Sequence, residues 1–368
     1  MKGSVQRVAN YVPAGNGTTR AHKLLEGQKM VKVGIIGMGF IGQQHFQTWA
    51  DVEGAQVVAV ADKQVEKVAA AAAAVGGNVG EAAALDLSGV QRFTDADEML
   101  KAGGFDVVDI CLPTTVHALM TKKACQAGFH AICEKPMALS IEECDEMIAA
   151  AEANDRLLFI AQCIRFWPEY EVLAGMIQKG ELGRLVSMKF TRVSPSPFWS
   201  QDGWLNDSSK SGGALLDLHV HDADYIMSVM GMPKAVFSRA GHMAPDGPKV
   251  DHVMTHYIYD DVAVFAEGGW AMPPTYPFEM AYEVLGEKGC LRFSTSRDPM
   301  LSFHPAQGDP VTPEYRATSG YMQELEYFAA CIENNQVPTR VTAFDAREAI
   351  RLILAEKESI ETGQIVEL

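Results

Sequence analysis

The segment Gly37-Met-Gly-Phe-Ile-Gly42 has the residue types and spacing of a dinucleotide-binding loop. It follows a buried-strand pattern at residues 31–36, opens a helical stretch, and precedes Asp62, which ends the next apolar run. Gly37 permits a tight turn, Gly39 lets the backbone approach a pyrophosphate, and Gly42 permits close packing of helix on strand. The helix N-terminus then offers free N–H groups to the anion. We expect this loop to bind a dinucleotide through Gly37, Gly39, Phe40, Ile41 and Gly42.

Asp62 and Lys63 bear on which dinucleotide binds. A carboxylate at this place accepts hydrogen bonds from both hydroxyls of an adenosine ribose and repels a 2′-phosphate. The Lys63 ammonium offsets part of that repulsion. NAD is therefore the expected cofactor, and NADP remains the alternative.

Two further strand patterns end in residues that suit the nicotinamide half of such a cofactor. They read Cys111-Leu-Pro-Thr-Thr-Val-His117 and Cys133-Glu-Lys-Pro136. In an open parallel sheet, ligands bind beyond the carboxyl ends of the strands. A Pro-containing helix start is the alternative for residues 115–117. We expect cofactor contacts from Leu112, Pro113, Thr114, His117, Glu134 and Lys135.

Lys135 directly follows an apolar strand and is pinned by Pro136. Its ammonium can hydrogen-bond a substrate hydroxyl and stabilise the alkoxide that develops there. The alternative is an ordinary surface lysine. Its place at the cofactor edge favours the functional interpretation.

The segment 212–225, GGALLDLHVHDADY, places Asp217, His221 and Asp224 on one face if it is a single helix. A carboxylate one turn from a histidine orients the imidazole and supports its protonated form, as a general base requires. His219 and Asp222 then point elsewhere. A metal site at His219 and His221 is the competing interpretation, which lacks a supporting distant Cys/His cluster. A buried structural histidine is the alternative for His219, and likewise for His45, His252 and His256.

Two segments contain residues that are typical of a substrate-binding site. Arg165 and Trp167 lie just past a strand pattern, and the long loop 194–213 carries Phe198, Trp199 and Trp204 among polar residues. Flat aromatic rings beside amide, carboxylate and hydroxyl groups suit a polyhydroxylated ring. The alternative is that these aromatic side chains pack the loop or an interface.

Composition excludes several classes of function. The chain has 31 Lys+Arg against 47 Asp+Glu, a formal charge of −16, and so acidic a body disfavours nucleic acid and anionic membrane as partners. No apolar run reaches the length of a spanning helix. Seven cysteines form no CxxC pair, so we expect no metal site and no disulfide framework, and a cytoplasmic location.

The elements that must position these residues divide the chain into three parts. Residues 1–30 read as a basic, turn-rich N-terminal arm. Residues 31–155 alternate strand and helix patterns, which predicts parallel βαβ units, and Ser140-Ile-Glu-Glu143 is a capping box that opens a helix. Residues 156–368 contain strand pairs joined by short turns at 260–261 and 286–289, which predicts a mostly antiparallel sheet. The fold class is therefore α/β, with a Rossmann domain followed by a second α/β domain.

Together these motifs resemble the Gfo/Idh/MocA family of oxidoreductases. The resemblance rests on VGIIGMGFIG (33–42), VVAVAD (57–62), CLPTTVH (111–117), EKP (134–136) and SGGALLDLHVHDAD (211–224). It implies that Lys135, Asp217 and His221 form the catalytic group. It also implies a homodimer or homotetramer assembled through the C-terminal sheet. His219, where many relatives have glycine, and the segment AQCIRFWPEY (161–170) depart from the usual pattern and leave the substrate open.

The resemblance implies hydride transfer between NAD and a secondary hydroxyl of a sugar, cyclitol or glycoside, with oxidation at glucosyl C3 among the candidates. His221 takes the hydroxyl proton, Lys135 holds the same oxygen, and Asp217 steadies both. The expected substrate-binding residues are Lys135, Arg165, Trp167, Trp204, Asp217 and His221. The competing hypothesis is a dinucleotide-binding sensor of the same fold that catalyses nothing.

Overall fold

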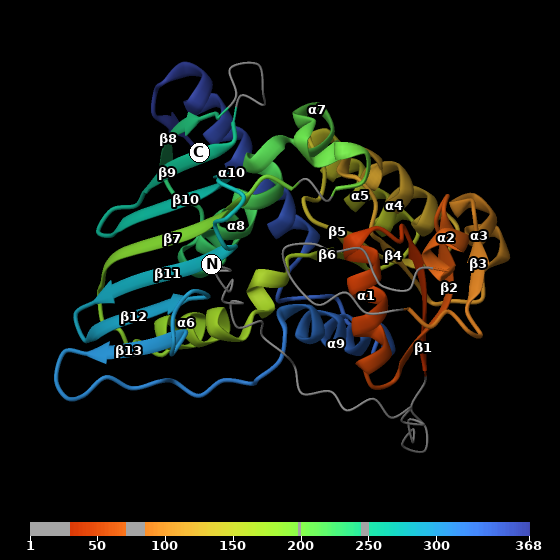
Figure 1. Cartoon of the computed structure of the whole chain (residues 1–368), viewed down its shortest axis with the longest axis horizontal. Coiled ribbons are helices and arrows are strands. Elements are labelled where there is room, and N and C mark those ends of the chain that lie inside the picture. The colour runs from red at the N-terminus through yellow and green to blue at the C-terminus, as the bar shows by residue number, and fades with distance from the viewer. Residues whose placement is uncertain (1–29, 71–84, 198–199, 244–249) are drawn as a thin grey trace, which may run out of the picture.

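The computed structural model describes residues 30–70, 85–197, 200–243 and 250–368, and it contains two large sheets side by side (Figure 1). The expected arm at 1–30, apart from its last residue, lies outside the described residues. So do Phe198 and Trp199.

The first sheet is parallel and has the strand order β3-β2-β1-β4-β5-β6. The order reverses at β1 and β4, which is the point where open α/β sheets bind ligands. Buried apolar residues fill these strands except the short edge strand β3, as expected for a sheet covered on both faces. The strands are β1 (Val31–Ile36), β2 (Ala55–Ala61), β3 (Gln91–Phe93), β4 (Val107–Ile110), β5 (His130–Glu134) and β6 (Leu158–Ala161).

The helices of this part begin where the sequence predicts them. In α5 the Ser140 hydroxyl accepts from the Glu143 N–H, and the Glu143 carboxylate accepts from Leu139, one residue before the cap. Asp95 caps α3 in the same way. The helices are α1 (Phe40–Asp51), α2 (Val65–Ala70), α3 (Ala96–Ala102), α4 (His117–Gln126) and α5 (Ile141–Ala153).

The second sheet has eight strands in the order β13-β12-β11-β7-β10-β9-β8-β14. The two hairpins expected from the sequence, β9–β10 and β11–β12, are confirmed. Each neighbouring pair is antiparallel except β7 and β10, which run parallel in the centre. The strands are β7 (Leu185–Pro195), β8 (Ala235–Gly241), β9 (His252–Ile258), β10 (Ala263–Met272), β11 (Glu279–Gly286), β12 (Gly289–Ser294), β13 (Leu301–Pro305) and β14 (Val366–Glu367).

The helices of the second part pack mainly on one face of this sheet, with α10 against β8 and α8 (Figure 1). The other face alternates between exposed and half-buried residues, with Met254 and Leu285 among its exposed side chains. Assembly of a dimer or tetramer through this face stays a prediction. The helices are α6 (Pro168–Gln178), α7 (Ser208–Ser211), α8 (Val220–Met230), α9 (Gly320–Glu333) and α10 (Ala343–Thr362).

Helix α9 returns to the first sheet, although it lies late in the chain. Its Leu325 and Phe328 share a buried cluster with Val31 of β1 and Trp49 of α1. The division at residues 31–155 and 156–368 stays a prediction, and β6, the last strand of the first sheet, follows residue 155. Along the described parts of the chain, every helix is too short or too polar to cross a membrane.

Candidate active site

A cleft of about 2260 Å³ extends from the glycine-rich loop of the first sheet to the inner ends of the second sheet. Pockets for small ligands commonly measure about 300–1,000 Å³, so this one has room for a dinucleotide and a second molecule. Residues of both sheets line it. A side chain can contact cofactor or substrate only if it lines this cleft.

The three glycines of the loop differ in what surrounds them. Gly37 has a φ of 95°, and a Cβ placed on it would lie 2.3 Å from the Cys111 carbonyl oxygen. A Cβ on Gly42 would lie 1.9 Å from the Gly37 carbonyl oxygen, which shows how tightly α1 packs on its own loop. A Cβ on Gly39 would meet no atom within 4 Å. Gly39 therefore borders open cleft at the start of α1, where a pyrophosphate meets free N–H groups.

The Asp62 carboxylate lies across the loop, at the end of β2. It accepts from the Met38 N–H at 2.9 Å and the Gln64 N–H at 2.7 Å, so its position in the cleft is fixed. Lys63 also lines the cleft. This donor and acceptor set fits the pyrophosphate and ribose of NAD, and Phe40 and Ile41 line the same region.

Of the residues expected to contact the nicotinamide end of the cofactor, some line the cleft and others do not. Leu112, Pro113, Glu134 and Lys135 line the cleft. Thr114 and His117 are buried and do not line it. The His117 ring instead contacts the Leu112 carbonyl oxygen at 2.7 Å and the Pro136 carbonyl oxygen at 2.9 Å. His117 thus ties together the two loops that bear Pro113 and Lys135 and does not face the cofactor.

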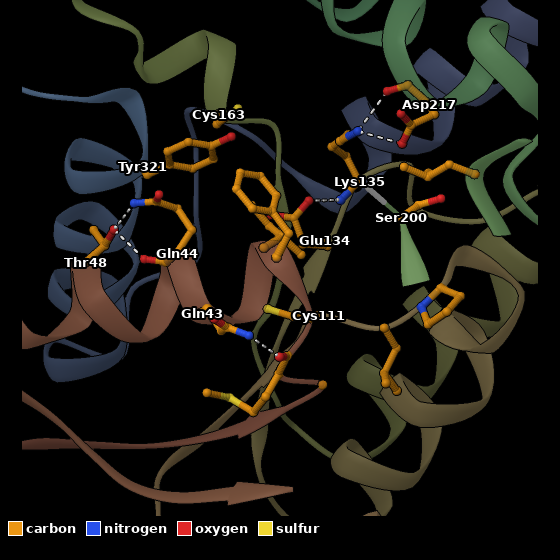
Figure 2. A pocket seen from close by; sticks show the side chains of 18 of the residues that line it. Gln43, Gln44, Thr48, Cys111, Glu134, Lys135, Cys163, Ser200, Asp217 and Tyr321 are labelled. Atoms are coloured by element: carbon orange, nitrogen blue, oxygen red, sulfur yellow. Dashed lines mark hydrogen bonds and ion pairs between the residues drawn. The ribbon is translucent and has the colours of Figure 1, made fainter. Parts of the chain in front are cut away.

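Lys135 and Asp217 meet at the cleft (Figure 2). Lys135 Nζ donates to Asp217 Oδ1 at 3.0 Å and to the Asp217 carbonyl oxygen at 2.7 Å. Their side chains are 15% and 18% exposed, so the pair is largely removed from water yet open to a ligand. A cation held in this way can donate to an oxygen that becomes negative.

His221 lines the cleft beside this pair, and its Nδ1 has no hydrogen-bond partner among the described residues. Burial lowers the pKa of His221 well below its usual value, and the charges of Lys135 and Arg192 lower it further. The imidazole is therefore neutral at pH 7. A neutral imidazole at the cleft wall can accept a proton.

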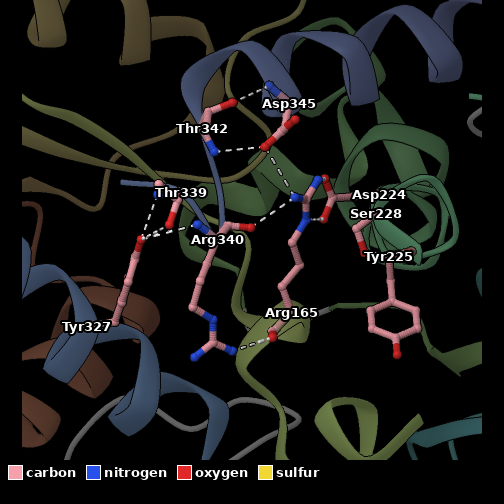
Figure 3. A network of polar contacts seen from close by, with 9 residues as sticks. All are labelled: Arg165, Asp224, Tyr225, Ser228, Tyr327, Thr339, Arg340, Thr342 and Asp345. Carbon is pink, nitrogen blue, oxygen red and sulfur yellow. Dashed lines mark hydrogen bonds and ion pairs between the residues drawn. The ribbon is translucent and has the colours of Figure 1, made fainter. Parts of the chain in front are cut away.

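The helical face expected for Asp217, His221 and Asp224 is wrong. Residues Leu215–His219 form a π-helical turn before α8, so the α-helical spacing does not hold across Asp217. The Asp217 carboxylate pairs with Lys135 instead of orienting His221. Asp224 points away from the cleft to Arg165, as Figure 3 shows.

Of the residues expected to bind substrate, some also line the cleft and one does not. Trp167 and Trp204 line the cleft, and Trp167 packs edge-to-face on Tyr321. Arg165 does not line it. Its guanidinium donates to both Asp224 oxygens at 2.6 and 2.7 Å, and to the Arg340 carbonyl oxygen and Asp345 (Figure 3). The position after β6 therefore predicts a cleft residue correctly for Trp167, whereas Arg165 pairs with the buried Asp224 and the partly exposed Asp345.

Three cleft residues were missed from the sequence. Arg192 is buried; its Nε and Nη2 donate to Asp222 at 2.9 Å, and its Nη2 also donates to the Tyr170 hydroxyl at 3.1 Å. Glu169 Oε2 and Trp270 Nε1 are buried and have no hydrogen-bond partner among the described residues. All three line the cleft. Strand patterns alone give no signal for them, because a buried polar residue is recognised only once its neighbours are known.

His219 belongs to a buried network away from the cleft. Its Nε2 lies 3.0 Å from Glu356 Oε2 and 3.2 Å from the Tyr257 hydroxyl. The interpretation of His219 as a buried structural residue fits this, and its Nε2 is committed to Glu356 instead of to a metal shared with His221. His45 is also buried, and His252 is half-buried against Glu267, whereas His256 is exposed on β9, contrary to the structural interpretation.

We predict that Gly39→Ala weakens NAD binding, whereas Gly42→Ala destabilises the fold. In Gly39→Ala the added methyl meets no protein atom, so the free energy of unfolding should stay within about 0.5 kcal/mol while the NAD Kd rises tenfold or more, on the order of one lost charged hydrogen bond. Gly42→Ala forces its methyl onto backbone and should destabilise the fold by about 3 kcal/mol. Denaturant unfolding and NAD titration measure both. Equal destabilisation by the two substitutions would contradict the assignment of Gly39 to the cofactor.

Comparison with known proteins agrees with this geometry. Residues 31–162 match the family model of the GFO/IDH/MocA oxidoreductases described as an NAD-binding Rossmann fold, and residues 170–292 match a C-terminal domain model of the same family. The scyllo-inositol 2-dehydrogenase (NAD(+)) of Bacillus subtilis (strain 168) is 27% identical, with 93% of this chain and 97% of that protein aligned. The myo-inositol 2-dehydrogenase of Thermotoga maritima is 24% identical over 92% and 98%.

A levoglucosan dehydrogenase solved with NADH and levoglucosan has the same fold, with a TM-score of 0.79, 22% identity and coverage of 92% of this chain and 99% of that one. The glycine loop with Asp62, the Lys135–Asp217 pair and the two-sheet architecture thus occur in a chain whose two halves both match one family. The protein is an NAD-binding oxidoreductase of the Gfo/Idh/MocA family.

Proposed function

We propose that this protein oxidises a secondary hydroxyl of a neutral cyclic polyol, namely a sugar, cyclitol or glycoside, and catalyses the reverse ketone reduction. The observation that carries the proposal is the neutral His221 imidazole beside the Lys135–Asp217 ion pair, at the carboxyl edge of the NAD-binding sheet. A base and a cation together at the cofactor edge are what oxidation of an alcohol requires.

Each residue of this group has a distinct part in the reaction. His221 accepts the hydroxyl proton, since its imidazole is neutral and lines the cleft. Lys135 donates a hydrogen bond to the same oxygen and stabilises the negative charge that develops there. Asp217 fixes the Lys135 ammonium through two hydrogen bonds, which keeps the donor in place before the substrate arrives. Gly39 and Asp62 would hold NAD+ in the cleft, where it would supply the acceptor for the hydride that leaves the carbon.

The substrate end of the cleft supports a neutral, polyhydroxylated ligand. Arg192 lines the cleft and is matched by the buried Asp222, so its guanidinium adds no net charge to the substrate end. Glu169 Oε2 is available as an acceptor, and Trp270 Nε1 as a donor. Burial raises the pKa of the Glu169 carboxyl, although hydrogen bonds from its own backbone and from Tyr315 oppose this. Buried groups without partners favour a ligand whose hydroxyls satisfy them.

The names of related proteins support the same class. Two relatives are named for inositols, and the levoglucosan dehydrogenase holds an anhydrosugar. All three ligands are neutral cyclic polyols. We extend the class to glycosides, including oxidation at glucosyl C3, because the cleft has room beyond the cofactor.

The test is an assay of the full-length protein with NAD+ and a panel of myo-inositol, levoglucosan, D-glucose and methyl β-D-glucoside. We expect the NADH absorbance band to appear with at least one of them, and NMR of the product ketone identifies the oxidised carbon. If the enzyme keeps its cofactor between half-reactions, no NADH is released, and single-turnover spectra of the co-purified cofactor detect its reduction instead. A protein that binds NAD but reduces it with no member of the panel, under either protocol, would instead support the non-catalytic sensor.

Glu169→Gln tests the substrate end within the same assay. It replaces the buried acceptor by an amide of equal shape, and we expect KM for the active polyol to rise about tenfold while kcat changes less. Glu171→Gln is the matched control, because Glu171 lies on the same helix but pairs with Arg340 outside the cleft. Equal KM values for the two variants would remove Glu169 from the substrate site.

A further inference from the structure

A buried ion cluster lies directly behind the nicotinamide end of the cleft and takes no part in the mechanism above. His45 of α1 stands between Asp109 of β4 and Glu134 of β5, and we call these three residues the imidazole triad. His45 Nδ1 lies 2.9 Å from Asp109 Oδ2, and His45 Nε2 lies 3.1 Å from Glu134 Oε1. The side chains of His45 and Asp109 are fully buried, and that of Glu134 is 7% exposed.

The surroundings of His45 make it a cation. Burial alone would lower its pKa, but Asp109 and Cys111 outweigh this and hold the pKa well above its usual value. Trp49 Nε1 also donates to Asp109 Oδ2 at 2.8 Å, so the carboxylate behind the imidazole is fixed in turn. The triad thus joins two carboxylates to one imidazolium and has one excess negative charge.

Glu134 is the member of the triad that reaches the cofactor cleft. Its Oε2 accepts from the Lys135 N–H at 3.0 Å (Figure 2), and its Oε1 forms an ion pair with His45 Nε2 at 3.1 Å that lacks hydrogen-bond geometry. It lines the cleft with Cys111 and Leu112, whereas His45 and Asp109 do not. The nearby Lys135 ammonium is already matched by Asp217. The excess negative charge therefore faces the cleft at Glu134.

The position of this charge has a redox consequence. The nicotinamide ring is positively charged in NAD+ and neutral in NADH, and a carboxylate held in place near it stabilises the charged form more. We propose that His45 is a positioning residue that fixes the Glu134 carboxylate at the nicotinamide, and that the fixed carboxylate makes the protein bind NAD+ in preference to NADH. The inference rests on NAD binding in the orientation of the proposed function, but not on the identity of the polyol.

The test is a titration of full-length protein with NAD+ and with NADH, which needs no substrate. Glu134→Gln keeps the shape of the side chain and removes its charge. We expect the ratio of the Kd for NAD+ to the Kd for NADH to rise about tenfold, the scale of one charged hydrogen bond. His45→Gln frees Glu134 Oε1 and also removes a positive charge behind it, and these two effects on the ratio oppose each other, so its shift should be smaller than that of Glu134→Gln. The double variant measures the coupling, because the shift caused by His45→Gln should differ with and without the Glu134 charge.

Glu324→Gln is the matched control. Glu324 of α9 is fully buried near the triad, and burial, with the charge of Glu134, raises the pKa of its carboxyl well above the usual value. Its raised pKa disfavours the charged form, so the amide should change the Kd ratio less than Glu134→Gln does. A general loss of packing in this region would weaken the binding of NAD+ and of NADH equally and would leave the Kd ratio unchanged.

Two results would overturn the inference. One is that Glu134→Gln weakens NAD+ and NADH equally, and the other is that His45→Gln shifts the ratio to the same extent with and without Glu134. Thermal unfolding and near-UV circular dichroism identify a variant that has not folded, and Glu134→Gln, at the cleft wall, keeps the test decisive if His45→Gln does not fold. Intact binding of both cofactor forms without any polyol oxidation would refute the proposed function and leave this inference standing.

Discussion

Replacing Lys135 by methionine should lower kcat for polyol oxidation by about 10² or more, while the NAD Kd and the thermal midpoint change little. Methionine fills a similar volume without the ammonium, so the oxygen loses the donor that stabilises its developing charge. Asp217 then remains at the cleft wall without its partner, at 18% exposure, where water can solvate it. The measurement is steady-state kinetics on the active polyol, with NAD titration and thermal unfolding of the same protein.

The pH profile separates the role of His221 from that of Lys135. Oxidation needs the neutral imidazole, and the pKa of His221 is lowered well below 6.5. The value of kcat/KM should therefore stay level as the pH falls through 6.5, and should decline only at the lowered pKa. His221→Ala should lose about 10² or more in kcat together with this acid limb. Near-normal turnover in both Lys135→Met and His221→Ala would remove these residues from catalysis.

Local sequence patterns are sufficient to predict the elements whose defining contacts join residues that are close together in the chain. The glycine loop, the Ser140 cap of α5 and the hairpins β9–β10 and β11–β12 depend on residues within a few positions of one another. Their identity follows from glycine conformation, capping hydrogen bonds and turn chemistry. These elements were predicted to within a few residues.

Long-range packing explains the elements that were not predicted. Helix α9 completes the core of the first sheet from a place nearly 300 residues later in the chain than β1, and nothing in its own sequence reports that destination. The parallel pairing of β7 with β10 likewise depends on strands far apart in sequence. The π-helical turn at Leu215–His219 is a third case, since a single extra residue in a turn leaves the apolar pattern almost unchanged.

The same distinction applies to the site. Motif positions brought Lys135, Asp217 and His221 to one cleft, because strand ends and a helix start determine where those residues lie. Arg165 and His117 had equally suggestive positions, but buried partners take up their polar atoms. Whether a polar side chain is free depends on charges contributed by distant elements, which the sequence around it does not contain.

Breaking the buried ion pair between Arg192 and Asp222 by removing one charge should cost more stability than breaking a surface pair of comparable geometry. Asp222→Asn should lower the free energy of unfolding by about 3–5 kcal/mol, because it leaves the Arg192 guanidinium buried without a counter-charge. The two side chains are 2% and 0% exposed, with both contacts to Asp222 at 2.9 Å. Chemical denaturation of the full-length protein measures the change.

Asp145→Asn is the control for this comparison, because its partner Arg347 makes a similar contact at the surface, where the side chains are 54% and 25% exposed. That substitution should cost no more than about 1 kcal/mol. The double variant Arg192→Met/Asp222→Leu removes both buried charges and should recover most of the stability lost in Asp222→Asn, since no unpaired charge remains. It should not recover polyol oxidation, because it removes the Arg192 side chain from the lining of the cleft. A cost for Asp222→Asn no greater than that for Asp145→Asn would show that this pair does not hold the segment after His221 in place.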